Sequence, residues 1–254
     1  MAEILNIDSN SEGINSPFRG RRGFEAIILA GGLGTRLQSV VSDVPKCMAP
    51  INGVPFLKFI IDDLKKQGIT RFIFSLGYKS ESIIDFAEDK YPSLEKIYVI
   101  EKEPLGTGGA IKKSCKQVKG KTVLVLNGDT LFAINLKTLR DLHTKQQHAC
   151  TLALKPMTDF SRYGAVETGN NNAVTAFHEK KFCAKGLING GIYALDAQLF
   201  LQEPLPEKFS FEKDYLEANI GNSKLYGIAF DGYFIDIGIP EDYERANKEL
   251  RTTN

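Results

Sequence analysis

The stretch that decides the fold is FEAIILAGGLGTRL, residues 24–37. Its first seven residues form a nearly continuous apolar run, which is typical of a strand buried on both faces of a parallel sheet. The glycines that follow allow positive φ angles and let the backbone approach a ligand closely. We therefore expect a buried strand that ends in a glycine-rich loop, at the sheet edge where open α/β folds bind ligands.

Apolar runs and amphipathic segments continue to alternate as far as residue 147. The pattern predicts strands at 71–75, 97–100 and 122–127, and helices at about 55–67, 80–89, 107–117 and 136–147. Ser80 is the expected N-cap of the second of these helices. This alternation of strands and helices indicates a doubly wound parallel sheet.

After residue 148 the sequence pattern predicts mainly strands. We expect strands at about 149–155, 163–168, 173–178, 188–195, 224–229 and 233–236, short helices at 197–202 and 211–219, and a last helix from Pro240. The fold predicted for residues 23–254 is thus a single α/β domain with a Rossmann-like, doubly wound mixed sheet and a more antiparallel C-terminal half. Polar residues 1–22 are expected to be a flexible extension, or else a small arm that binds phosphate or a partner.

Composition excludes several classes of protein. The chain has 254 residues, a net charge of +1 and 43% hydrophobic residues, so it carries no basic excess of the kind that binds nucleic acid. It has neither an apolar run of the ~20 residues that a membrane span needs nor a secretory signal pattern. The spacings of its four cysteines fit neither a zinc site nor a disulfide framework, which favours a reducing compartment and a cytoplasmic location.

The loop GGLGTRL, residues 31–37, is the first candidate for phosphate binding. Backbone N–H groups in such a turn can surround phosphate oxygens, and Arg36 adds a planar donor that is permanently charged. The spacing fits neither the dinucleotide motif GxGxxG nor a Walker A loop. A tight turn with a solvated arginine is the alternative, but Arg36 together with Lys46 downstream favours phosphate binding.

Residues 31–37, followed by Pro45-Lys46 and the turn MAPING at 48–53, resemble the signature of the sugar nucleotidylyltransferases. The resemblance extends over residues 24–247. It implies a nucleotidyltransferase fold in which the N-terminal half binds the nucleotide and the C-terminal half binds a sugar phosphate. It also implies the reaction, in which a nucleoside monophosphate passes from a nucleoside triphosphate to a sugar 1-phosphate and pyrophosphate is released.

The resemblance assigns the nucleotide-binding residues Leu29, Gly31, Gly32, Gly34, Thr35, Glu101, Gly106 and Thr107. It implies that Arg36 holds the departing pyrophosphate and that Lys46 lies near the transferred phosphate. Both roles suit the chemistry, since phosphoryl-type transfer needs mainly positioning and cations that face the developing charge. The alternative for Lys46 is a surface lysine beside a proline.

The segment EKEPLGTGG, residues 101–109, opens a predicted helix whose N-terminus would favour an anion. By resemblance this segment holds the nucleobase, and relatives that bind thymine or uracil tend to carry glutamine where this chain has Glu101. A carboxylate only accepts hydrogen bonds, and guanine offers two adjacent donors. GTP is therefore the expected nucleotide, with dTTP, UTP or CTP, or a solvent-facing Glu101, as alternatives.

Two aspartates at predicted strand ends are the candidate ligands of a metal. Asp129 follows the strand 122–127, and Asp236 follows a strand near the C-terminus. Proteins commonly hold Mg²⁺ by one or two carboxylates plus phosphate oxygens. Either acid alone could be a loop residue, but both match the metal positions of the resembled family, which implies an Mg²⁺ cofactor and counts Asp129 among the catalytic residues. Relatives usually read Asp-x-Gly-Thr-Pro here, whereas this chain has Ile239 in place of threonine.

The sugar-phosphate side is assigned by resemblance to Gly128, Glu179, Lys180, Asn189, Gly191 and Glu212. Lys180 is the fourth implied catalytic residue and would hold the sugar phosphate, while Glu179 would accept hydrogen bonds from sugar hydroxyls. The sequence NGG at 189–191 resembles a sugar-binding turn of the family. An exposed lysine pair and a plain turn are the respective alternatives.

The partners expected for this chain are small molecules, GTP and a sugar 1-phosphate, and the chain could form a homo-oligomer. The resemblance favours D-glycero-α-D-manno-heptose 1-phosphate as the sugar, with mannose 1-phosphate or glucose 1-phosphate as alternatives. A catalytically inactive sensor of nucleotide sugars, or a regulatory subunit, is the alternative of another class. The presence of Arg36, Lys46, Asp129, Lys180 and Asp236 together argues against that alternative.

Overall fold

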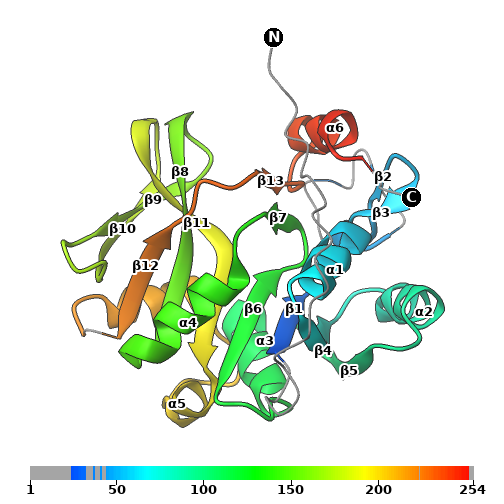
Figure 1. Ribbon diagram of the computed structural model, residues 1–254, viewed down its shortest axis with the longest axis horizontal. Coiled ribbons are helices and arrows are strands. Elements are labelled where there is room, and N and C mark those ends of the chain that lie inside the picture. The colour runs from blue at the N-terminus through cyan, green and yellow to red at the C-terminus, as the bar shows by residue number, and fades with distance from the viewer. Residues whose placement is uncertain (1–23, 33–36, 38–40, 42–43, 223, 252–254) are drawn as a thin grey trace, which may run out of the picture.

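A mixed sheet of nine strands organises the residues that the computed structural model describes, which are 24–32, 37, 41, 44–222 and 224–251. Seven strands follow the order β10-β9-β11-β6-β1-β4-β5, while β8 pairs with β11 and β12 pairs with β8 (Figure 1). The parallel and antiparallel halves of the sequence therefore share one sheet. The predicted extension, residues 1–22, lies outside the described residues.

The parallel half contains the four strands expected from the apolar runs. They are β1 (Phe24–Leu29), β4 (Ile69–Leu76), β5 (Glu95–Ile100) and β6 (Thr122–Asn127). Strand β1 lies between β4 and β6, parallel to both. Its central residues Ala26, Ile27 and Ile28 are fully buried, as a strand covered on both faces requires.

Helices cover both faces of the sheet, which confirms the doubly wound arrangement. On one face, α1 (Phe56–Lys66), α2 (Ser80–Lys90) and α4 (Leu136–Gln146) contribute to one buried apolar cluster. On the other face, α3 (Gly106–Cys115), α5 (Ala197–Gln202) and a π-helix η2 (Phe211–Leu216) contribute to a second cluster. Ile27 belongs to the second cluster and its neighbour Ile28 to the first, because successive side chains of a strand point to opposite faces.

The C-terminal half is antiparallel except for one pairing, as predicted. It comprises β8 (Cys150–Phe160), β9 (Gly164–Thr168), β10 (Val174–Lys180), β11 (Cys183–Asp196) and β12 (Leu225–Ala229). Strand β11 joins the two halves, since residues 192–196 pair with β6 while residues 187–188 pair with β9. Its register against β8 shifts between Asn189 and Tyr193.

Several small elements were not predicted from the sequence. They are the 3-10 turn η1 (Lys46–Met48), the hairpin of β2 (Pro50–Ile51) with β3 (Val54–Pro55), and β7 (Thr130–Phe132), which pairs with the predicted strand β13 (Phe234–Asp236). At the hairpin tip, the Asn52 amide donates to the carbonyls of Asn247 and Leu250, both at 2.9 Å. We call this contact with the end of α6 (Pro240–Glu249) the Asn52 clasp.

One local prediction, the cap of α2, was wrong. The cap position of α2 is Lys79, in a left-handed conformation with φ +50°, and Ser80 is buried in the first turn without a capping bond. The short helix expected at 211–219 is present, as the π-helix η2 followed by a 3-10 turn, Glu217–Asn219. Irregular helices of this kind are frequent near functional sites.

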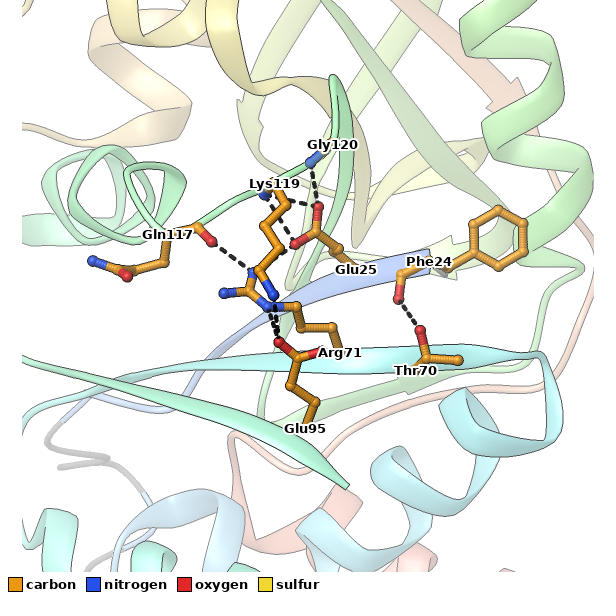
Figure 2. Close-up of polar contacts among 8 residues, drawn as sticks. All are labelled: Phe24, Glu25, Thr70, Arg71, Glu95, Gln117, Lys119 and Gly120. Atoms are coloured by element: carbon orange, nitrogen blue, oxygen red, sulfur yellow. Dashed lines mark hydrogen bonds and ion pairs between the residues drawn. The ribbon is translucent and has the colours of Figure 1, made fainter. Parts of the chain in front are cut away.

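A buried ionic network ties together the amino ends of three parallel strands (Figure 2). Arg71 of β4 donates to the carboxylates of Glu25 on β1 at 2.5 Å and Glu95 on β5 at 2.8 Å. Its guanidinium also donates to the carbonyl of Gln117 at 2.6 Å. The Glu25 carboxylate accepts the backbone N–H groups of residues 119 and 120 as well. We call this set the Arg71 network, and it lies at the edge of the sheet opposite the candidate site.

Candidate active site

A cavity of about 720 Å³ lies at the carboxyl ends of the parallel strands, within the size range of small-molecule sites. Loops that follow β1, β4, β5 and β6 form most of its wall, as expected for an open α/β sheet. The lining residues are 29–32, 46–47, 75, 77–78, 101–104, 106–107, 110, 127–129, 212 and 238.

Every predicted nucleotide-binding residue that the structure describes lines this cavity. These are Leu29, Gly31, Gly32, Glu101, Gly106 and Thr107. Gly34, Thr35 and the predicted catalytic Arg36 lie outside the described residues, so their roles stay predictions. Ser75, Gly77 and Tyr78 also line the cavity and were not predicted, although they follow a parallel strand and the same rule would have found them.

Glu101 is held as a fixed acceptor in the cavity wall. Its Oε2 accepts the backbone N–H of Leu105 at 2.9 Å, and its own N–H donates to the carbonyl of Leu76 at 2.8 Å. Its Oε1 lies 3.5 Å from the point that a Cβ on Gly31 would occupy. Since each carboxylate oxygen has two acceptor positions, both oxygens keep capacity for donors of a ligand.

The two candidate metal ligands and the candidate catalytic lysine lie together; Lys46 and Asp129 line the cavity, whereas Asp236 is not among the lining residues. Lys46 Nζ donates to Asp129 Oδ2 at 2.5 Å and lies 3.6 Å from Asp236 Oδ1. Pairing of β13 with β7 brings Asp236 beside the Asp129 loop. A Cβ on Gly238 would lie 2.8 Å from Asp236 Oδ1 and 2.9 Å from Lys46 Nζ, so only glycine fits there without displacing these groups.

The charges around Lys46, Asp129 and Asp236 suit a divalent cation. Burial raises the pKa of Asp236, and the charge of Asp129 raises it further, while Lys46 opposes both effects. Two carboxylates that share one ammonium group can share a metal ion instead. No group of three or more His, Cys, Asp and Glu side chains with metal-binding geometry occurs in the described ranges. The remaining ligands of an Mg²⁺ ion would therefore be phosphate oxygens and water, as is usual for this ion.

Ile239 takes the N-cap position of α6 and provides no side-chain cap. The Gly238 N–H instead donates to Asp236 Oδ1 at 2.8 Å. The position of this carboxylate is thus fixed by a backbone donor, which does not depend on the threonine that relatives carry at 239.

Cys47 lines the cavity next to Lys46 but is no nucleophile. Burial, followed by the charge of Asp129, raises the pKa of its thiol to about 12. A thiol that stays protonated at neutral pH attacks phosphorus poorly, since the thiolate is the nucleophile.

On the predicted sugar side, Gly128 and Glu212 line the cavity, whereas Asn189 and Gly191 stand behind it. The segment 189–191 is not a turn, as the resemblance implied, but part of the register shift inside β11. Gly191 has φ +72°, and a Cβ there would lie 2.7 Å from Asn127 Nδ2, in the cavity wall. Bulges of this kind re-aim side chains near sites. Here Asn189 donates to the Tyr193 hydroxyl at 2.7 Å.

Glu179 and Lys180 lie apart from the other predicted residues. They end the edge strand β10, are exposed, and do not belong to the cavity lining. The structure therefore does not bring them together with Lys46 and the two aspartates, and their roles stay predictions.

The fold and the acidic, lysine-containing site define a nucleotidyltransferase. The sequence profile of the family described as nucleotidyl transferase matches residues 25–253, and the chain belongs to this family.

Two similar proteins that are named heptose 1-phosphate guanylyltransferases are matched over nearly their whole length. The chain is 51% identical over 227 residues to the D-glycero-α-D-manno-heptose 1-phosphate guanylyltransferase of Aneurinibacillus thermoaerophilus, covering 89% of this chain and 98% of that protein. It is 52% identical over 219 residues to the enzyme of the same name from Campylobacter jejuni, covering 86% and 96%. The crystal structure of HddC from Yersinia pseudotuberculosis complexed with GMP-PN has a TM-score of 0.81 at 38% identity, covering 90% and 100%.

Helices long and apolar enough to cross a membrane do not occur in the described part of the chain.

Proposed function

We propose that this nucleotidyltransferase transfers GMP from GTP to D-glycero-α-D-manno-heptose 1-phosphate, giving GDP-heptose and pyrophosphate. A phosphate oxygen of the sugar attacks the α-phosphorus, and the new P–O bond forms as the bond to the β-phosphate oxygen breaks. The pyrophosphate leaves with the electron pair. The incoming phosphate is already an anion, so the reaction needs no protein nucleophile.

The observation that carries the choice of guanine is the fixed carboxylate of Glu101. It lines the cavity and is anchored by Leu105, so its acceptors are preorganised. Guanine offers its ring N1–H and exocyclic amine side by side, which a carboxylate can accept together. Uracil and thymine present acceptors on either side of one donor, and an ionised Glu101 would repel them. The guanylyltransferases named above, half identical to this chain, support the same choice and the heptose substrate.

Asp129 and Asp236 would hold Mg²⁺, which neutralises charge on the transferred phosphate when it is bound. Lys46 contacts both carboxylates from the cavity wall, where its ammonium can also face a phosphate oxygen. Arg36 is proposed to stabilise the departing pyrophosphate and Lys180 to hold the sugar phosphate, as the family resemblance implies. A cytoplasmic location, a single domain over 23–254 and a homo-oligomer stay predictions.

The test measures pyrophosphate release with Mg²⁺ for each of GTP, dTTP, UTP and CTP, paired with heptose 1-phosphate and with mannose 1-phosphate. We expect turnover with GTP and heptose 1-phosphate. The variant Glu101→Gln should lose about 10- to 100-fold in kcat/KM for GTP, because it replaces a hydrogen bond to a charged acceptor. Turnover with dTTP or UTP alone would refute the reasoning on Glu101 but keep the enzyme class. Absence of turnover in every pairing would favour a sensor.

A further inference from the structure

The N-terminus of α3 lies at the cavity and is partly covered by the segment around Phe209. The N–H groups of Gly108 and Gly109 donate to the carbonyl of Phe209, at 3.0 and 3.4 Å. Phe209 N–H in turn donates to the carbonyl of Leu105 at 3.0 Å. Two of the N–H donors at this helix end, those of Gly108 and Gly109, are therefore used within the protein.

The glycines of this segment serve the same docking. A Cβ on Gly106 would lie 2.5 Å from the Phe209 carbonyl oxygen, and one on Gly108 would lie 2.1 Å from the Phe209 ring. A Cβ on Gly109 would lie 2.3 Å from the carbonyl oxygen of Glu207. Within residues 106–109 only Thr107 carries a side chain, and this side chain faces the π-helix η2.

The Thr107 hydroxyl has both of its hydrogen-bonding roles filled by η2. It donates to Glu212 Oε2 at 2.7 Å and accepts the Phe211 N–H at 2.9 Å. A hydroxyl has one proton, so Thr107 cannot donate to a nucleotide while it holds Glu212. Ser210 Oγ donates to the same Glu212 oxygen at the longer distance of 3.2 Å.

Glu212 is thereby fixed in the cavity wall with one carboxylate oxygen to spare. Its Oε2 receives two donors, whereas Oε1 has no hydrogen-bond partner among the residues that the structure describes. The pKa of the buried Tyr193 hydroxyl is raised by burial and then by the charge of Glu212, so this carboxylate lies near the Tyr193–Asn189 pair. A preorganised carboxylate oxygen suits a sugar hydroxyl, which must donate to an acceptor when it is removed from water.

We infer that Thr107 is a positioning residue for the sugar phosphate rather than a nucleotide contact: it holds Glu212 so that the free oxygen accepts a hydroxyl of the sugar. The inference rests on the proposed function only for the identity of the sugar. It gives Thr107 a role that differs from the predicted nucleotide contact, and it gives the predicted role of Glu212 a structural cause. The N-terminus of α3 then supports both the nucleobase segment, residues 101–109, and the pocket proposed for the sugar.

The experiment is a double-mutant cycle on Thr107→Val, Glu212→Ala and the double variant, with separate KM values for GTP and for heptose 1-phosphate. Thr107→Val removes the hydroxyl at nearly constant shape and should raise the KM for the sugar phosphate roughly tenfold or more. The KM for GTP should stay within about twofold. In the Glu212→Ala background the valine should add little, since contacting residues couple.

Two further variants separate positioning from folding. Thr107→Ser keeps the hydroxyl and should restore the sugar-phosphate KM. Thr70→Val is the matched control, because Thr70 lies at the amino end of β4, where its hydroxyl donates to the carbonyl of Phe24 and to no other described residue (Figure 2). It should change neither KM.

Equal rises of both KM values in Thr107→Val, a rise for GTP alone, or additive effects in the cycle would overturn the inference. Wild-type turnover with another substrate pair would refute the proposed function only, and the cycle would then be run with that pair. If the wild type turns over no pair, calorimetric binding of heptose 1-phosphate and of GTP to the same variants decides the question.

Discussion

Replacing Arg71 by leucine should destabilise the protein strongly without changing its chemistry. Arg71 is 6% exposed, as is its partner Glu25, and it donates to two carboxylates and one carbonyl (Figure 2). Removing one partner of a buried ion pair costs about 3–5 kcal/mol, because a charge is left buried. Glu25 keeps the backbone donors of residues 119 and 120, so we expect the lower end, about 3 kcal/mol.

For a chain of this size, such a loss lowers Tm by roughly 6–12 °C. Thermal and urea unfolding, followed by circular dichroism, measure it. kcat should not change, because a rise of four residues along extended strand, about 13 Å, separates Glu25 from Leu29, where β1 reaches the cavity lining. Lys119→Ala is the control: its ammonium pairs with Glu95 at the surface, where an ion pair contributes about 0–1 kcal/mol.

The double variant Glu25→Leu with Arg71→Leu tests the cause. Without the unpaired carboxylate it should be more stable than Arg71→Leu alone, since replacing both partners by apolar groups is often close to neutral. A loss below about 1 kcal/mol in Arg71→Leu, or a double variant less stable than the single one, would refute the reasoning.

Three other predictions concern the site, the clasp and pH. Lys46→Met should lower activity. Adding Mg²⁺ should raise the Tm of this variant more than the Tm of the wild type, because Lys46 and the cation compete for Asp129 and Asp236. Equal rises in Tm of the two proteins in a thermal scan would contradict this. Asn52→Ala should lower the free energy of unfolding in urea by about 2 kcal/mol, because two hydrogen bonds are lost and alanine disfavours the left-handed backbone of residue 52. Asn52→Gly should lower it less, because glycine adopts this conformation without strain. Burial lowers the pKa of His143 to about 4 from 6.5. The folded state thus disfavours protonation, so stability is complete above about pH 6.5 and should fall by roughly 2–3 kcal/mol towards pH 4.5. Urea midpoints at pH 7 and 4.5 should show a smaller fall in His143→Gln, and identical falls would exclude this histidine as the cause.

The sequence predicted the parallel half well because its signal is local. Runs such as 24–30 and 122–127 are apolar enough to be strands on their own; the second agrees with β6 at both ends, and β1 ends one residue before the predicted run. The cavity wall followed from the same reasoning, since carboxyl ends of adjacent parallel strands must meet. Glu101 and Asp129 were therefore placed correctly in the wall before the fold was known.

The features that the sequence did not reveal depend on contacts between distant segments. Phe209 against the glycines of α3, the network of Arg71 with Glu25, and the register shift near Asn189 all join parts of the chain whose patterns are ordinary when taken alone. Lys180 lies outside the cavity lining, although its motif resembles that of the family. A motif specifies neighbours along the chain, and only the sheet order decides which motifs meet.

The strand order also determines when each strand can find its partner while the chain is being synthesised. Strand β6 pairs with β1 on one side, and its other edge pairs with residues 192–196 of β11. A chain that grows from its N-terminus therefore leaves that edge of β6 open while residues 128–191 are made, which takes roughly 3–13 s at ordinary rates of translation. An open apolar edge invites pairing with other chains. The Lys46–Asp236 contact and the Asn52 clasp form later still, so this part of the candidate site is assembled only after Asp236 has been made.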